Sequence, residues 1–499
     1  MERNDIAQQA PYAKPLDAKP QSLPLIADAV PGYSSPASQA PGPPCKGRNP
    51  SVFIFNPFAE GYIAHGPAFT PVKHQAKLAE DLASLPQFLC QPEDIVLLEK
   101  RPSAGFLNNL NQAGFPLPEF VELREGRIDP ADNLCQRKLG HLRPWAWGPD
   151  SVKLLEPLFA QVAGETRTAN QYFNDDTARL YSKAWSADFL RKVLNRCRLG
   201  AGAAAPWLCS EQESGIAVDN LEAARGAIAT IRRRSHHRVV VKEALGLAGH
   251  NAIRLWEPEL LAAQRQWMTH ALEAGRQLVV EPWLERELDF SVQLEMEPRN
   301  LKLCGYTGLV NDRKGQFLAN WADADYSRCL PAKVTALFHT QPNISEQPHR
   351  FYGEIFSLLE AELQRVGFIG PVSIDAFVYR TPQGDCRLKP VVEINPRYTM
   401  GRLTLELMKH TCPGSSGLFR LVTRTQARAE GFAELSSYAR SLGESHPLRL
   451  AGEPLPKIRE GALCLTDPSQ AQVCLATFTV SPTLNWPGSL SGPEPQSSH

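Results

Sequence analysis

An antiparallel hairpin that carries two acids is the feature that most constrains the fold of this chain. The segment GPVSIDAFVYR alternates in the manner of a strand, and the turn TPQGD leads into a second run, KPVVEINPR. Regular pairing should stop near Pro396, which cannot donate to a sheet ladder. In such a hairpin Asp375 and Glu393 can meet across the ladder, and Asn395 points to the same side as Glu393. Two facing carboxylates destabilise a sheet unless a positive charge lies between them, so the pattern indicates a built site.

The same three side chains form a donor set made only of oxygen atoms. Mg²⁺ prefers carboxylate and amide oxygens and usually completes its coordination with phosphate oxygens. The alternative is an exposed sheet edge with solvated acids. The apolar residues around both acids, in SIDAF and VVEIN, favour the metal site. The sequence therefore predicts that Asp375, Glu393 and Asn395 bind Mg²⁺, with Mn²⁺ as a second candidate ion.

Charge and composition exclude several classes of partner. The 499 residues carry 53 basic and 53 acidic side chains, so no global field attracts the chain to nucleic acid or to an anionic membrane. No apolar run approaches the roughly 20 residues needed to span a bilayer, and the N-terminus lacks the order of a signal peptide. The 11 cysteines lack C-x-x-C pairs, which favours reduced thiols and argues against zinc. We expect a soluble cytoplasmic protein with no nucleic-acid or membrane partner.

Two further motifs lie upstream of the hairpin. Lys242 ends the apolar run VVV and leads into a loop with Gly246 and Gly249, which is suited to cradling phosphate. A lysine snorkelling from a strand end is the alternative, and the loop matches neither the P-loop nor the dinucleotide fingerprint. The run LVVEPWL stops at Glu281 and offers free backbone groups beside an apolar wall, as adenine requires. Its alternative is an ordinary strand end with Trp283 in the core.

Taken in order, these motifs resemble the ATP-grasp superfamily over about 150–430. The preceding alternation of strands and helices resembles the α/β domain that usually comes before it. The resemblance implies a mixed α/β (α+β) fold with a small lid subdomain and a larger antiparallel-sheet C-terminal subdomain. The expected units are a disordered Pro/Ala/Ser-rich leader at 1–48, the parallel α/β domain at 49–150, the N-terminal part with the lid at 151–285, the metal- and nucleotide-binding core at 286–430, a C-terminal extension at 431–490 and a disordered tail at 491–499.

The resemblance also implies roles for individual residues. Lys242 and Arg397 would be catalytic, and Arg254 falls where a basic residue often follows the lid loop. The weaker substrate candidates are Arg313, Arg402 and, in the N-terminal unit, Glu60 and His65, each with a structural role as the alternative. The residues implied to bind ATP are Lys183, Lys242, Gly246, Gly249, Glu281, Trp283, Leu284, Glu287 and Asp289, with Glu287 or Asp289 on the ribose. Two departures from the family pattern are a lid loop with few glycines and an Asp, where many relatives carry Glu, at position 375.

The activity implied is that of an ATP- and Mg²⁺-dependent carboxylate–amine ligase. A substrate carboxylate attacks the γ-phosphate of ATP, and an amine or similar nucleophile then displaces phosphate from the acyl phosphate. Such chemistry depends on positioning and on neutralising charge, which cations and metal-holding oxygens supply. The expected partners are a small-molecule carboxylate and amine, and a homodimer is compatible with the resemblance. A phosphotransferase of the same fold and an inactive nucleotide-binding scaffold are the alternatives.

Overall fold

The computed structural model describes residues 47–164, 167–201, 206–246, 251–311, 317–323, 347–452 and 456–482. Nearly all of the expected leader, the expected tail, Gly249 and Arg313 lie outside these residues. Three sheets organise the described chain, with strand orders β3-β2-β1-β4, β5-β8-β6-β7 and β13-β12-β9-β10-β11-β14-β17-β16-β15. Among the described helices, none is long and apolar enough to cross a membrane.

The first sheet is parallel and belongs to the N-terminal unit. Its core strand VFI is buried, and each of its neighbours runs in the same direction. Its strands are β1 (Val52–Ile54), β2 (Ile95–Leu98), β3 (Glu119–Glu122) and β4 (Leu142–Pro144). The helices that accompany or follow it are α1 (Ala59–His65), α2 (Lys73–Leu82), α3 (Ala104–Gln112), α4 (Pro149–Leu155), α5 (Ala169–Tyr172) and α6 (Asp175–Leu180).

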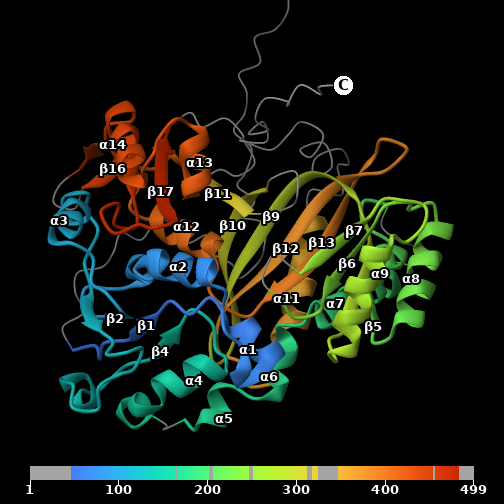
Figure 1. Cartoon of the computed structure of the whole chain (residues 1–499), viewed down its shortest axis with the longest axis horizontal. Coiled ribbons are helices and arrows are strands. Elements are labelled where there is room, and N and C mark those ends of the chain that lie inside the picture. Colours follow the sequence, from blue (N-terminus) through green and yellow to red (C-terminus); the bar gives the residue numbers. More distant parts are fainter. Residues whose placement is uncertain are drawn as a thin grey trace, which may run out of the picture.

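The second sheet is small and antiparallel, and it lies at one end of the molecule with two helices against it (Figure 1). Its strands are β5 (Ile216–Val218), β6 (Val239–Glu243), β7 (Ala252–Leu255) and β8 (Leu278–Pro282), and its helices are α8 (Leu221–Arg233) and α9 (Ala262–Glu273). Strand alternation explains the two faces. Val239, Val241, Leu278 and Val280 pack under α8 and α9, which leaves Lys242 and Glu281 on the opposite face.

The third sheet is antiparallel throughout, with nine strands among the described residues. It begins with β9 (Glu285–Met296), β10 (Leu301–Asn311), β11 (Phe317–Asp323), β12 (Gly370–Arg380), β13 (Cys386–Asn395) and β14 (Ser416–Thr423), and continues with β15 (Arg449–Ala451), β16 (Lys457–Cys464) and β17 (Cys474–Ser481). The strands after 430 therefore join the same sheet as the hairpin, because β17 pairs with β14 along its whole length. Helices α12 (Met400–Met408), α13 (Arg424–Ala429) and α14 (Leu435–Ser445) lie between these strands in sequence.

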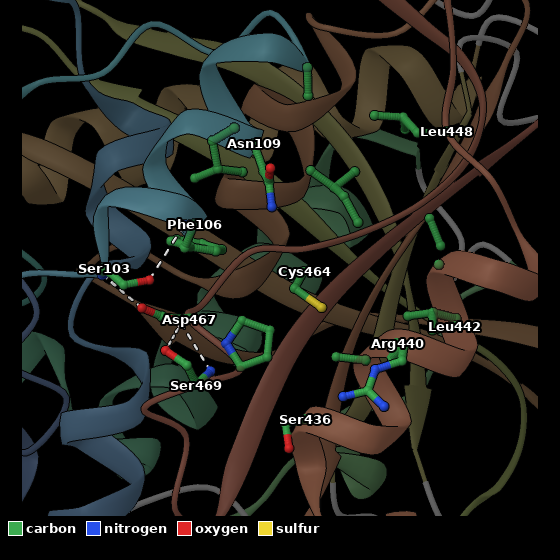
Figure 2. A pocket seen from close by; sticks show the side chains of 17 residues that line it. Ser103, Phe106, Asn109, Ser436, Arg440, Leu442, Leu448, Cys464, Asp467 and Ser469 are labelled. Atoms are coloured by element: carbon green, nitrogen blue, oxygen red, sulfur yellow. Dashed lines mark hydrogen bonds between the residues drawn. The ribbon is translucent and has the colours of Figure 1, made fainter.

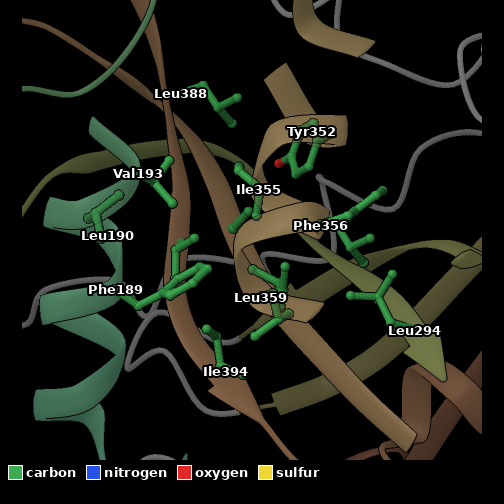
Figure 3. Packing of buried hydrophobic residues seen from close by; sticks show 14 of the residues in the cluster. Phe189, Leu190, Val193, Leu294, Tyr352, Ile355, Phe356, Leu359, Leu388 and Ile394 are labelled. Carbon is green, nitrogen blue, oxygen red and sulfur yellow. The ribbon is translucent and has the colours of Figure 1, made fainter. Parts of the chain in front are cut away.

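One face of the large sheet is closed by two long helices, α7 (Lys183–Ala201) and α11 (Gln347–Arg365). Phe189 and Val193 of α7 and Ile355 and Leu359 of α11 meet the apolar side chains of β9, β12 and β13 (Figure 3). The alternate residues of β9, such as Gln293, point to the other face, where α12 lies. Packing of one face thus presents the polar residues of the same strands on the opposite face.

These parts follow one another along the chain. A parallel α/β unit comes first, a small antiparallel sheet with two helices second and a large antiparallel sheet third. The predicted mixed α/β fold class is confirmed. The strand β13 forms one edge of the large sheet. This edge is covered, because α7 packs along it. The backbone of Leu388 also exchanges hydrogen bonds with Trp207 and Cys209, at 2.7 and 2.9 Å.

Candidate active site

The two acids of the hairpin lie directly opposite each other. Asp375 of β12 and Glu393 of β13 are Cα partners in the antiparallel ladder, as the sequence predicted. The Asn395 side-chain nitrogen donates a hydrogen bond to Asp375 Oδ2 at 3.1 Å. The intervening Ile374 and Ile394 turn to the other face and are buried in the core between α7 and α11. Core packing therefore fixes the direction in which the acids point.

The surroundings of the two acids shift their pKa values in opposite directions. Burial, and then the charge of Glu393, raise the pKa of Asp375 to about 6. Burial acts on Glu393 in the same direction, but the Lys183 ammonium, 3.0 Å from Glu393 Oε1, outweighs it and lowers the pKa of Glu393. The pair therefore favours a further positive charge at Asp375.

The donor set fits a hard divalent cation. Across the described part of the chain, no group of three or more His, Cys, Asp or Glu side chains is arranged to hold a metal ion. Two carboxylates and one amide at the hairpin would leave several coordination positions for water or phosphate, which is the arrangement Mg²⁺ commonly adopts. Asp375 reaches the site with the shorter acid side chain, and the direct pairing of its strand with β13 brings it opposite Glu393.

Lys183 connects the acids to the loop that follows β6. It is the first residue of α7, and its backbone nitrogen donates to Ala244 O at 2.8 Å. Its Nζ donates to Gly246 O at 2.9 Å and also contacts Glu393. A side chain at Gly246 would meet Asn251, since an added Cβ would lie 2.8 Å from Asn251 Nδ2. Glycine at this position therefore leaves room for the Asn251 side chain.

Lys242 and Glu281 form an ion pair on the inner face of the small sheet. Lys242 Nζ lies 2.6 Å from Glu281 Oε1, because the two residues are diagonal neighbours in the β6–β8 ladder. The other carboxylate oxygen lies 2.9 Å from Lys389 Nζ, on β13. Burial lowers the pKa of Lys242 although Glu281 opposes the shift. Burial alone would raise the pKa of Glu281, but Lys242 and Lys389 together hold it far below its usual range.

Sequence reasoning missed Lys389. The available signal was a lysine inside the otherwise apolar run LKPVV, where an unpaired ammonium would be costly. Its partner could not be named from the sequence, because Glu281 lies 108 positions earlier in the chain.

The connector between β8 and β9 contains the other residues predicted to contact nucleotide. Trp283 is half-buried, and its ring lies under the guanidinium of Arg254, 5.0 Å from the ring centroid. Leu284 is buried in the main core. Glu287 pairs with Arg380. Asp289 pairs with Arg286 at 2.8 Å, so both ribose candidates already have an arginine partner.

Arg397 lies at the boundary between the large sheet and the N-terminal unit. Its backbone forms a bridge with Ala146, two residues after the end of β4. Its Nε lies 2.9 Å from Oε1 of Glu60, a buried residue of α1. Burial would lower the pKa of Arg397, but Glu60 and then Glu393 raise it. The guanidinium is thus charged and held by Glu60, and the Arg397 side chain is 21% exposed.

The remaining substrate candidates lie elsewhere. Arg402 on α12 pairs with Glu295 at 2.8 Å and with Glu406 at 3.1 Å, and Arg143 shares Glu295 at 2.9 Å. The structure therefore places Arg402 in a second ionic network. His65 stacks on a neighbouring ring, with its centroid 5.9 Å from that of Phe69.

A cavity of about 510 Å³ lies between α3 and α14 (Figure 2). Its wall includes Phe106, Leu442 and Cys464, and at one end Asp467 accepts a hydrogen bond from the backbone nitrogen of Ser103 at 2.7 Å. None of the predicted site residues lines this cavity.

No family model matches this sequence, and no curated protein matches it. Solved structures similar to this chain include the N5-carboxyaminoimidazole synthetase of Staphylococcus aureus complexed with ADP. It has 11% identity, coverage of 88% of this chain and 94% of that chain, and a TM-score of 0.44. A biotin carboxylase of Campylobacter jejuni in a βγ-ATP complex has 13% identity, coverage of 77% and 86%, and a TM-score of 0.41.

A third similar structure is the biotin carboxylase domain dimer of the Hydrogenobacter thermophilus 2-oxoglutarate carboxylase, in complex with MgADP, ADP and bicarbonate. It has 11% identity, coverage of 87% of this chain and 86% of that chain, and a TM-score of 0.42. At these identities and TM-scores, function has to be inferred from the side chains of this chain itself.

Proposed function

We propose that this chain is an ATP- and Mg²⁺-dependent ligase that joins a carboxylate to an amine and releases ADP and phosphate. The observation that carries the proposal is the position of Lys183. Its Nζ lies 3.0 Å from Glu393 Oε1 and donates to Gly246 O at 2.9 Å. One ammonium thus links the acid pair to the start of the loop expected to cover phosphates. Phosphates bound there would meet cations on one side and metal-holding oxygens on the other.

In this proposal Asp375, Glu393 and Asn395 hold the metal ion. Mg²⁺, when bound, neutralises phosphate charge and orients the γ-phosphate. Lys183 and Lys242 supply further positive charge to the phosphates. Phosphoryl transfer needs positioning and charge neutralisation more than covalent participation by the protein, so this set of groups is sufficient in kind.

The connector from Glu281 to Leu284 would bind adenine through its backbone, with the ring of Trp283 beside it. The burial of Leu284 supports this assignment, because it holds the connector against the core. Glu287 or Asp289 would bind the ribose hydroxyls after exchanging an arginine partner.

Arg397 would neutralise the substrate carboxylate and the acyl phosphate formed from it. Its contact with Glu60 supports this role, because that contact orients the guanidinium at the boundary with the N-terminal unit. Arg402 is left out of the assignment, since two of its guanidinium nitrogens are already engaged by Glu295 and Glu406. The carboxylate and the amine are small molecules whose identity has to be found by screening.

Two measurements test the proposal. Calorimetric titration should give ATP binding that Mg²⁺ strengthens, and this gain should be absent in Glu393→Gln but retained in the control Glu297→Gln, whose side chain is 43% exposed. Pools of amino acids and small carboxylates are then screened for ADP release, with product masses read afterward. Absence of ATP binding would sink the nucleotide assignment. Binding without ADP release from any pool would favour the inactive scaffold, and a stable phosphorylated product would favour the phosphotransferase.

A further inference from the structure

Glu281 is shared by two lysines that reach it from different sheets. Lys242 comes from the small sheet, and its Nζ lies 2.6 Å from Oε1. Lys389 comes from the large sheet, and its Nζ lies 2.9 Å from Oε2. One buried carboxylate therefore has one more cation than it needs for neutrality. The roles assigned above use Lys242 and leave Lys389 without a purpose.

The two lysines differ in their freedom to leave. The Lys389 side chain is 2% exposed, and its Nζ also donates to Glu213 O at 3.0 Å. The Phe377 ring lies beside it, with its centroid 5.8 Å from Nζ. The Lys242 side chain is 19% exposed and lies on the strand that leads into the phosphate-covering loop. Lys389 is thus held in place, and Lys242 is the lysine able to change partner.

We propose that Lys389 is a positioning residue that keeps Glu281 compensated while Lys242 moves from Glu281 to a nucleotide phosphate. The inference rests on the proposed ATP-dependent function and adds to it a residue outside the set assigned above. In the nucleotide-free protein Lys242 forms an ion pair with Glu281. When phosphate arrives, Lys242 exchanges one anion for another, and Lys389 alone neutralises Glu281.

Burying an unpaired charge is costly, and this cost is why a second lysine matters. A buried carboxylate that loses its only cation is strongly destabilised, so a lone Lys242 would be retained by Glu281. Phosphate would then have to compete with the carboxylate for the same ammonium. The apparent affinity for phosphate would be the intrinsic affinity multiplied by the fraction of protein in which Lys242 is released. A second, fixed lysine removes that competition. The loss of affinity on removing Lys389 should appear only for ligands that carry phosphate.

The test compares ATP with adenosine by calorimetric titration in the presence of Mg²⁺. In Lys389→Met the dissociation constant for ATP should rise tenfold or more, while that for adenosine stays within twofold of the wild type. The control is Lys192→Met, which removes the lysine of another ion pair, in which Lys192 Nζ lies 2.6 Å from Glu362 Oε1. In that control the preference for ATP over adenosine should be unchanged.

A second comparison separates positioning from folding. In Glu281→Gln no carboxylate remains to hold Lys242, so adding Lys389→Met to it should change the ATP-over-adenosine preference by less than threefold. A larger change in that double variant would overturn the inference, as would an unaltered preference in Lys389→Met. This comparison holds even if Lys389→Met alone fails to fold. Wild-type protein that binds no ATP would instead overturn the proposed function and the inference together.

Discussion

Two acids on neighbouring sheets have pKa values shifted in opposite directions, one of them downward and the other upward. Glu281 lies between two lysines, and its pKa is held far below the usual range despite its burial. Asp375 faces another carboxylate, and burial together with that neighbour raises its pKa to about 6. The protein therefore compensates one acid from its own side chains and leaves the other short of positive charge.

The difference separates a structural charge from one that requires a ligand. A fully paired buried carboxylate contributes to a fixed arrangement of strands, here the approach of the small sheet to β13. An underneutralised pair of acids is costly unless a cation joins it, so its presence next to Lys183 suggests that a metal ion supplies the missing charge. The same replacement of acid by amide should consequently have opposite effects at the two positions.

The largest effect is expected for Glu281→Gln. The change leaves Lys389, which is buried, and Lys242 without their shared carboxylate, and breaking a buried ion pair in this way typically costs about 3–5 kcal/mol of unfolding free energy. Urea unfolding at pH 7 measures the loss. The half-exposed control Glu297→Gln, whose carboxylate lies 3.9 Å from Lys302 Nζ, should change stability by about 1 kcal/mol or less. Equal stabilities for the two variants would contradict the account of Glu281 as a compensated structural charge.

Next in size is the effect of Glu393→Gln on catalysis. The variant keeps the shape of the side chain but removes a carboxylate from both the proposed metal site and the contact with Lys183. Loss of one such charge-stabilising contact typically lowers turnover about 10²-fold or more. Steady-state ADP release with the substrates found by screening measures this, and circular dichroism checks the fold. Turnover within tenfold of the wild type would remove Glu393 from the metal site.

Sequence reasoning reached the arrangement of the hairpin because its partners are close in the chain. Alternation and the turn TPQGD predict that Asp375 and Glu393 lie on one face of the hairpin, and the fold class could also be predicted. The register next to the turn, with Phe377 opposite Lys389, would alone place Asp375 opposite Val391, and a register shift between Asp375 and Phe377 places it opposite Glu393. The contact between Arg397 and Glu60 could not, because 337 positions separate the two residues. Pairing of β14 with β17 is non-local in the same way, so the strands after 430 could be expected but their place in the large sheet could not be derived. Local patterns predict elements, and tertiary packing decides which elements share a site.

A smaller effect of opposite sign is expected for Asp375→Asn in the nucleotide-free protein. The pKa of Asp375 is raised on folding, so its charged form opposes folding at pH values above about 6, and this cost disappears as the pH falls below the unfolded value. One pKa unit corresponds to about 1.4 kcal/mol, so the amide should stabilise the fold at pH 8 by about 1–3 kcal/mol.

Urea unfolding at pH 8 and pH 4 checks this prediction, since most of the gain should be lost at the lower pH. Asp385→Asn, in the exposed turn of the same hairpin, is the matched control and should change little at either pH. A destabilised Asp375→Asn at pH 8 would mean that the fold already compensates this acid, as it does Glu281.

The smallest effect is the pH dependence of nucleotide binding in the wild type. Protonated Asp375 is a poor metal ligand, so the gain in ATP affinity from Mg²⁺ should shrink as the pH falls through about 6, by about tenfold per unit once the acid is mostly protonated. Titration of ATP with and without Mg²⁺ from pH 8 to pH 5 measures it. ATP itself titrates in this range, so the same series in Asp375→Asn serves as the reference, in which only the nucleotide's own step should remain. Glu281 should contribute nothing to this profile, because its two lysines keep it ionised throughout. An identical step in the wild type and in Asp375→Asn would assign the whole pH dependence to the nucleotide.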